Sequence, residues 1–132
     1  MCKVLIADND GFFLKCFIIP ILTEVLKKNC SSYSAYSGQE LDVITASNGY
    51  EALLLFAEKK PDIVITEFDI PMMNGKQLLA QINGRHKTES FLMGYDKTDT
   101  DTDIKFIHKK DVFKMFFQGI KDGIVQINNN SI

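Results

Sequence analysis

Five short runs rich in apolar residues are spaced along the chain, and the stretches between them carry apolar residues at helical spacing. Short apolar runs of this kind are typical of strands whose two faces are both buried. Strands are therefore predicted at residues 4–7, 41–46, 63–66, 91–95 and 104–107.

Between the first runs, apolar residues recur every three or four positions, which is the spacing of one helix face. A first helix is predicted over residues 12–28, with a kink or a late start at Pro20, because proline lacks the backbone donor that a helix interior needs. A second helix is predicted over 49–59, with Asn48 as its cap. A third begins at about residue 74, where an asparagine precedes a glycine.

The remaining stretches are less regular. Residues 29–39 are rich in Ser, Tyr and Gly, which predicts a surface loop. Residues 96–103 are polar and have no apolar stripe for a helix. A last helix is predicted with Asp111 as its cap. Its five large apolar residues cannot all face inward, so one or two are expected to remain for a partner; they are Val112, Phe113, Met115, Phe116 and Phe117.

Alternating strands and helices in this number predict a parallel sheet with helices on both faces. The fold class is therefore a doubly wound, five-stranded parallel α/β domain. Ligands of such sheets bind at the carboxyl ends of the strands. The polar residues that follow the predicted strands are the candidates for chemistry: Asp8, Asn9, Asp10, Glu67, Asp69, Asp96, His108 and Lys109.

Length and charge narrow the classes of function. The 132 residues suit one domain, predicted at 1–125 with a tail at 126–132. The net charge of −2 gives no long-range attraction to nucleic acid or anionic lipid. No apolar run approaches the roughly 20 residues of a membrane span, and none suits a signal peptide, so the protein is expected in the cytoplasm. The three cysteines show no metal-ligand spacing.

Three segments of the sequence resemble the receiver domain of two-component response regulators, which has a flavodoxin-like fold. Residues 4–10 resemble its first strand and acidic pair, 61–75 its third strand and following loop, and 106–109 its fifth strand with a lysine. A weaker match lies at 46–53. The resemblance covers about residues 3–120, and the 61–75 segment is the most specific, because its Pro and Gly follow the acid at the family's offsets.

The resemblance implies a set of roles at the ends of the strands. In the family, an aspartate after the third strand accepts a phosphoryl group from a histidine kinase, and two acids after the first strand help to hold Mg²⁺. A lysine after the fifth strand pairs with the phosphoryl group, and a Thr or Ser and an aromatic residue switch in response. The matching positions in this sequence are Glu67 for the acceptor, Asp8, Asn9 and Asp10 for the acidic pocket, Lys109 for the lysine, and Tyr95 and Phe106 for the switch.

The sequence departs from the family's pattern at the acceptor position and in the acidic pair, and Tyr95 replaces the Thr or Ser. Glu67 stands where the acceptor aspartate belongs, and its extra methylene moves the carboxylate by about one C–C bond, ~1.5 Å. Such a displacement can cost about 100-fold in rate. Asn9 replaces the second acid and removes a negative charge. Magnesium is therefore expected to bind weakly or not at all through Asp8 and Glu67, and no cofactor is predicted.

A further departure is the length of the connection between the last two strands. The family has a helix of a few turns there, whereas this chain has ten residues, 96–105, and these are poor helix formers. The fourth helix of the receiver fold is therefore predicted to be missing or shortened.

These features favour an atypical receiver, a pseudo-receiver, that binds a protein without aspartyl phosphorylation and is not an enzyme. The expected partner is a histidine kinase, an output protein or a second receiver, and a homodimer is left open. Two alternatives remain. One is a working Mg²⁺-dependent phospho-acceptor. The other is a flavodoxin-like small-ligand binder, which the acids at Asp8 and Asp10 disfavour because they would repel a phosphate.

Overall fold

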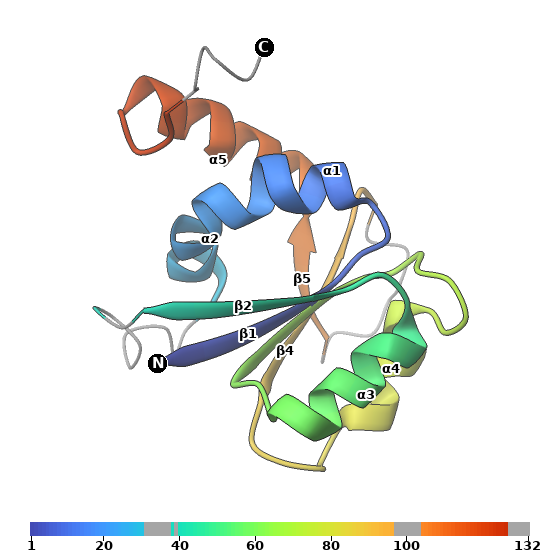
Figure 1. Cartoon of the computed structure of the whole chain (residues 1–132). Helices are drawn as coiled ribbons and strands as arrows, with labels where there is room; N and C mark the ends of the chain where they lie inside the picture. The colour runs from blue at the N-terminus through green and yellow to red at the C-terminus, as the bar shows by residue number, and fades with distance from the viewer. Residues whose placement is uncertain (31–37, 39, 97–103, 127–132) are drawn as a thin grey trace.

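The computed structural model describes residues 1–30, 38, 40–96 and 104–126, and contains one parallel sheet between two layers of helices (Figure 1). The strand order is β2-β1-β3-β4-β5. The order reverses at β1, as in a doubly wound sheet, which confirms the predicted fold class. The strands are β1 (Cys2–Ala7), β2 (Leu41–Ala46), β3 (Ile63–Glu67), β4 (Glu89–Gly94) and β5 (Lys105–His108).

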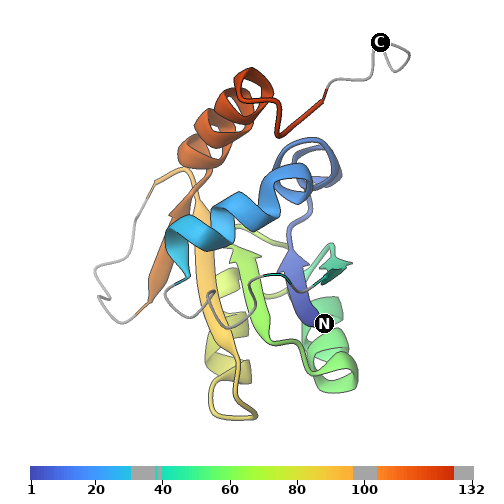
Figure 2. The same cartoon turned by 90° about the vertical axis from the view of Figure 1, so that its left-hand side faces the viewer.

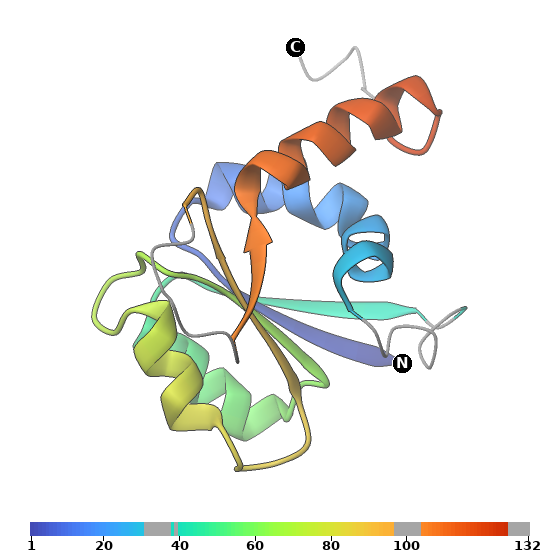
Figure 3. The same ribbon diagram turned by 180° about the vertical axis from the view of Figure 1, so that it is seen from behind.

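The helices divide between the two faces of the sheet, as two perpendicular views make plain (Figure 2). One face carries the N-terminal helical segments together with α5, and the other carries α3 and α4 (Figure 3). Each face has its own apolar core, and β3 contributes to both because all its residues are buried. The main helices are α2 (Leu22–Asn29), α3 (Gly49–Lys59), α4 (Gly75–Ile82) and α5 (Lys109–Lys121).

The predicted first helix is broken into four pieces around Pro20. α1 (Gly11–Phe13) leads into a π-helical segment η1 (Leu14–Ile18), a 3₁₀ turn η2 (Ile19–Ile21) and then α2. Proline has no N–H to donate and its ring crowds the carbonyl one turn earlier. The wider turn of η1 before Pro20 and the short turn around it relieve both problems. The predicted kink is thereby confirmed.

Helix starts were predicted well where an asparagine caps them. The side chain of Asn48 accepts a hydrogen bond from the Glu51 N–H, and Asn74 forms a reciprocal capping box with Gln77. The predicted cap at Asp111 is wrong, because α5 begins at Lys109 with His108 as an N-cap that makes no side-chain bond. The chain passes from β5 directly into the helix, and the Lys109 side chain contacts Asp8 and Glu67 at the ends of β1 and β3.

Three predictions concern residues outside the described ranges. The loop at 29–39 and the tail at 126–132 fall largely on such residues. The missing or shortened fourth helix of the receiver fold falls mostly on 97–103. The described residues of that connection (96, 104 and 105) belong to no helix.

Candidate functional site

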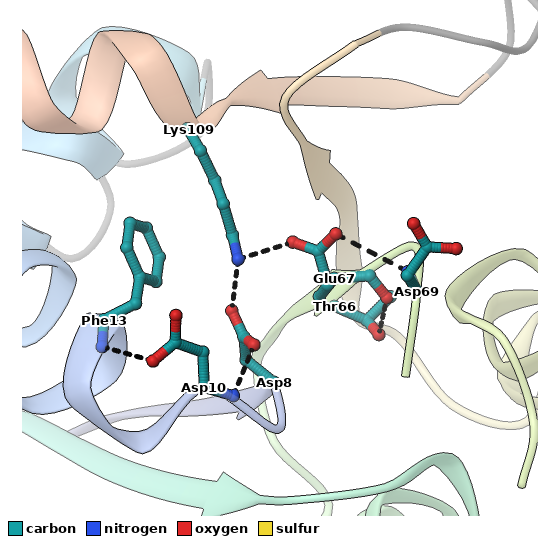
Figure 4. Close-up of polar contacts among 7 residues, drawn as sticks. All are labelled: Asp8, Asp10, Phe13, Thr66, Glu67, Asp69 and Lys109. Atoms are coloured by element: carbon teal, nitrogen blue, oxygen red, sulfur yellow. Dashed lines mark hydrogen bonds and ion pairs between the residues drawn. The ribbon is translucent and has the colours of Figure 1, made fainter. Parts of the chain in front are cut away.

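Two carboxylates and one ammonium group meet at the carboxyl edge of the sheet (Figure 4). Lys109 Nζ lies 2.9 Å from Asp8 Oδ2 and 2.8 Å from Glu67 Oε2. All three side chains are buried. The structure thus brings together three of the residues that the sequence singled out from three distant segments.

Strand register puts the two acids side by side. β1 and β3 are parallel neighbours, and Ala7 pairs with Thr66, so Asp8 and Glu67, the residues that follow this pair, lie at the same level of the sheet. Lys109 comes in from the far strand, because α5 begins where β5 ends. A site at the carboxyl edge next to the point where strand order reverses is the usual place for chemistry in such a fold.

The site holds more negative than positive charge. Burial by itself lowers the pKa of Lys109, but hydrogen bonds to Glu67 and Asp8 and their charges outweigh it, so the pKa lies above its ordinary value of 10.5. The lysine is therefore a fixed cation at neutral pH. One ammonium facing two carboxylates leaves the cluster with a formal charge of −1 when both acids are ionised.

Two aromatic rings complete the surroundings of the ammonium group. Lys109 Nζ lies 4.4 Å from the centroid of the Phe13 ring and 5.4 Å from that of Tyr95. Both distances are within the range of cation–π attraction. Sequence reasoning placed Phe13 only on a helix face. Its approach to the site follows from Asp10, whose side chain caps α1 and fixes the first helical turn beside the acids.

The Asp10 side chain caps α1, and Asn9 is exposed to solvent. Asp10 Oδ1 accepts a hydrogen bond from the Phe13 N–H at 3.0 Å, while the Asp10 N–H donates to Asp8 Oδ1 at 2.9 Å. Asn9 is exposed. Of the predicted acidic pocket, Asp8 therefore contacts the lysine directly, and Asp10 acts by orienting Asp8.

The loop after β3 selects Glu67 over Asp69 as the acid of the site. The Gly75 N–H donates to the Phe68 carbonyl at 2.8 Å, and a Cβ at this glycine would collide with the Glu67 carbonyl oxygen. This close approach is the reason why the loop needs glycine eight residues after the acid. Asp69 is exposed, and in Figure 4 its carboxylate points away from the lysine.

Gly94, which the sequence analysis did not single out, is the last residue of β4 and lies close to Glu67. A Cβ at Gly94 would lie 3.7 Å from Glu67 Oε1 and 3.4 Å from the Phe106 ring. Tyr95, the next residue, is half-exposed and stacks with Phe113. The last residue of β4 is thus the position from which a side chain would reach the acid, and here it carries none. The sequence did contain a signal for Gly94, because it lies near the end of the predicted strand at 91–95, where ligands of parallel sheets bind.

The acids as they lie do not fit a magnesium ion. Mg²⁺ takes near-octahedral oxygen ligands, including one or two carboxylates. Here the ammonium group of Lys109 occupies the space between Asp8 and Glu67, with contacts of 2.9 and 2.8 Å. The described part of the chain holds no cluster of three or more His, Cys, Asp or Glu residues that could bind a metal.

The fold and the buried acid–lysine cluster define a flavodoxin-like α/β domain with its site at the carboxyl edge of the sheet. A model of the response regulator receiver domain matches residues 4–114, and the chain belongs to that family. The signal receiver domain of NarL from Mycobacterium tuberculosis superposes with a TM-score of 0.62 at 18% identity, covering 93% of this chain and 95% of that one. At this identity the likeness concerns the fold.

Curated relatives match over part of their length. A protein-glutamate methylesterase/protein-glutamine glutaminase of Bacillus licheniformis is 35% identical over 83 residues, which are 62% of this chain and 19% of that protein. The chemotaxis protein CheY of Listeria monocytogenes is 31% identical over 94 residues, covering 70% of this chain and 66% of that protein. The chain thus spans about a fifth of the first of these proteins.

Receiver domains act in two-component systems, where they interact with histidine kinases and output domains. The resemblance identified in the sequence is therefore confirmed at the level of the family. Among the described helices, none is long and apolar enough to cross a membrane.

Proposed function

We propose that this protein is a pseudo-receiver, a protein-binding module of two-component signalling that works without phosphorylation of an acceptor aspartate. The observation that carries the proposal is the ion pair between Glu67 and Lys109 at 2.8 Å. Glu67 stands in the acceptor position, and its longer side chain holds a negative charge against the lysine with which a phosphoryl group would pair.

Three further features support a site that is held in one state. Asp10 is committed to capping α1, so it does not supply the acid that Asn9 lacks. Gly94 offers no hydroxyl group toward Glu67. Lys109 lies between the two carboxylates, where a metal ion would have to displace it. Magnesium binding is accordingly proposed to be weak or absent.

The proposal assigns a binding function and no enzymatic one. The partner is a histidine kinase, an output protein or another receiver; nucleic acid and membranes are not proposed as partners, and self-association is left to experiment. Cys2, Cys16 and Cys30 form no disulfide, which suits a reducing compartment such as the cytoplasm. The methylesterase activity in the name of the Bacillus relative belongs to a protein of which this chain covers 19%.

The test is the intact mass of the protein after incubation with acetyl phosphate and Mg²⁺. Wild type is expected to gain no phosphoryl group, whereas Glu67→Asp, which restores the acceptor, should gain one if the catalytic frame is intact. Glu67→Gln is the matched control, because it keeps the length of the side chain and cannot be phosphorylated. Labelling of wild type that disappears in Glu67→Gln would overturn the proposal and favour the Mg²⁺-dependent phospho-acceptor.

A further inference from the structure

A continuous aromatic surface joins α1 and α5, which lie side by side above the sheet (Figure 1). Phe12 is 69% exposed and Phe117 is 56% exposed. Both lean on the half-buried ring of Phe17, at centroid distances of 5.7 and 6.5 Å. We call Phe12, Phe17 and Phe117 the aromatic face. Two large exposed rings on one connected patch are more than scattered surface hydrophobics, and such patches mark interaction sites.

Lysines flank the aromatic face along α5. Lys110, Lys114, Phe117 and Lys121 follow one another at spacings of four, three and four residues, so they form one stripe on the helix, and all four are exposed. No ion pair with another described residue involves these three lysines. The stripe therefore combines an exposed aromatic ring with unpaired positive charge.

The charge of the stripe argues against a second copy of the chain as its occupant. A two-fold dimer brings the same patch of both subunits together. Lysines of one stripe would then face lysines of the other, which is repulsive. The occupant that complements both the rings and the charges has apolar side chains beside carboxylates.

The spacing of the stripe fits a helix better than an extended segment. From Lys110 to Lys121 an α-helix rises by about 16 Å, or three turns. A partner helix that packs along α5 would present acids at the same four- and seven-residue intervals, and charged pairs of this kind set partner choice between packed helices. A lipid surface would also attract lysines and the two exposed rings, Phe12 and Phe117, and the vesicle measurement below distinguishes that occupant from a protein helix.

The aromatic face is also in contact with the site. Phe13, which lies against the Lys109 ammonium group, packs on Phe17 at 6.3 Å and on Phe113 at 5.4 Å. Phe13 therefore links Phe17, the ring on which Phe12 and Phe117 pack, to the ammonium group of the site.

We infer that the aromatic face and the lysine stripe of α5 form the docking surface for an acidic amphipathic helix of a protein partner. This inference rests on the proposed function in one respect, that the partner is a protein. It holds whether or not Glu67 accepts a phosphoryl group.

The inference is tested with two synthetic helical peptides of identical apolar positions, one with glutamates and one with lysines on the flanking positions. Binding to the full chain is measured by fluorescence anisotropy. The acidic peptide is expected to bind at least about tenfold more tightly than the basic one. Phe117→Ser and Lys114→Glu should each weaken binding of the acidic peptide by about tenfold or more, and Lys114→Glu should improve binding of the basic peptide.

Matched controls carry the same changes elsewhere on the surface. Leu54→Ser alters an apolar residue that is 60% exposed on α3, and Lys87→Glu reverses an exposed charge far from α5 in the chain. Neither should change peptide binding. Urea unfolding of every variant establishes that it is folded, which is expected because each altered side chain is exposed.

Four results would overturn the inference: equal binding of both peptides, no binding of either, a dimer in sedimentation that Phe117→Ser dissociates, or cosedimentation with phosphatidylglycerol vesicles that Lys114→Glu abolishes. The proposed function fails separately, when acetyl phosphate labels wild type. Labelling together with selective acidic-peptide binding would remove the pseudo-receiver and leave the docking surface standing.

Discussion

Lys109 is buried between two acids, and it affects the stability of the fold and the arrangement of the site differently. A buried ion pair is often no more stabilising than well-packed apolar residues would be, because desolvation of the charges offsets their attraction. Removing one partner is costly, since the remaining charge is left buried. The contacts of Lys109 with Asp8 and Glu67 therefore hold these residues in one arrangement more than they strengthen the whole domain.

The first prediction concerns the loss of this cation. Lys109→Met keeps much of the apolar volume but leaves two buried carboxylates without a counter-charge. The free energy of unfolding, measured in urea at pH 7, should fall by about 3–5 kcal/mol. Lys110→Met changes the exposed neighbour in the same helical turn and should stay within about 0.5 kcal/mol of wild type.

The pH dependence of the free energy of unfolding tests the same cluster. The direction of the Lys109 pKa shift determines whether stability rises or falls with pH. Burial alone lowers the pKa of Lys109, but its bonds to Glu67 and Asp8 raise it above 10.5. The group's contribution is then fully present below its ordinary pKa and is lost as the pH rises through the folded-state value. Wild type should lose more stability above pH 10.5 than the uncharged triple variant Asp8→Asn, Glu67→Gln, Lys109→Met. Parallel curves for the two proteins would contradict the raised pKa.

Helices and strands follow local signals wherever those signals are strong. Asn48 and Asn74 cap α3 and α4 as predicted, because a side chain that satisfies a free N–H acts within one turn. Asp111 has the same chemistry but does not begin α5. α5 begins two residues earlier, at Lys109, whose side chain contacts Asp8 and Glu67, and a local sequence pattern does not contain these long-range contacts.

The end of α3 offers a test at the scale of one element. Lys60 is exposed and left-handed, with φ of 48°, a conformation that costs an L-residue with a side chain about 1–2 kcal/mol. Lys60→Gly should raise the free energy of unfolding by about 0.5–1 kcal/mol, after allowance for the greater freedom of the unfolded chain. Lys59→Gly is the control. Residue 59 is the last residue of α3, and this change should lower the free energy of unfolding by about 0.5–1 kcal/mol. Equal effects of both changes in urea unfolding would refute the assignment of strain to residue 60.

The site is built from the ends of three strands, β1, β3 and β5. A ligand that binds there should therefore raise the stability of the whole domain. The double variant Asn9→Asp, Glu67→Asp restores the acids of the family's pattern. At Mg²⁺ equal to ten times its dissociation constant, binding would add about 1.4 kcal/mol. The melting temperature of the double variant should therefore rise on addition of MgCl₂, while that of wild type should not.

The control for this prediction is Asn83→Asp, which adds an acid at an exposed position beyond α4. It should show no response to magnesium. A double variant that ignores magnesium would mean that the loops around the site, and not the two side chains alone, have diverged from a metal-binding arrangement.

Local patterns in the sequence were enough to predict the alternation of strands and helices, the parallel sheet, and which acids and which lysine follow the strand ends. Apolar runs, caps and proline act over a few residues, so they can be read locally. Only the tertiary structure shows that Lys109 lies between Asp8 and Glu67. It also shows that the Asp10 side chain caps α1 and that Phe13 and Gly94 border the site. These contacts join residues far apart in the chain, and they depend on strand register and helix placement, which local patterns do not specify.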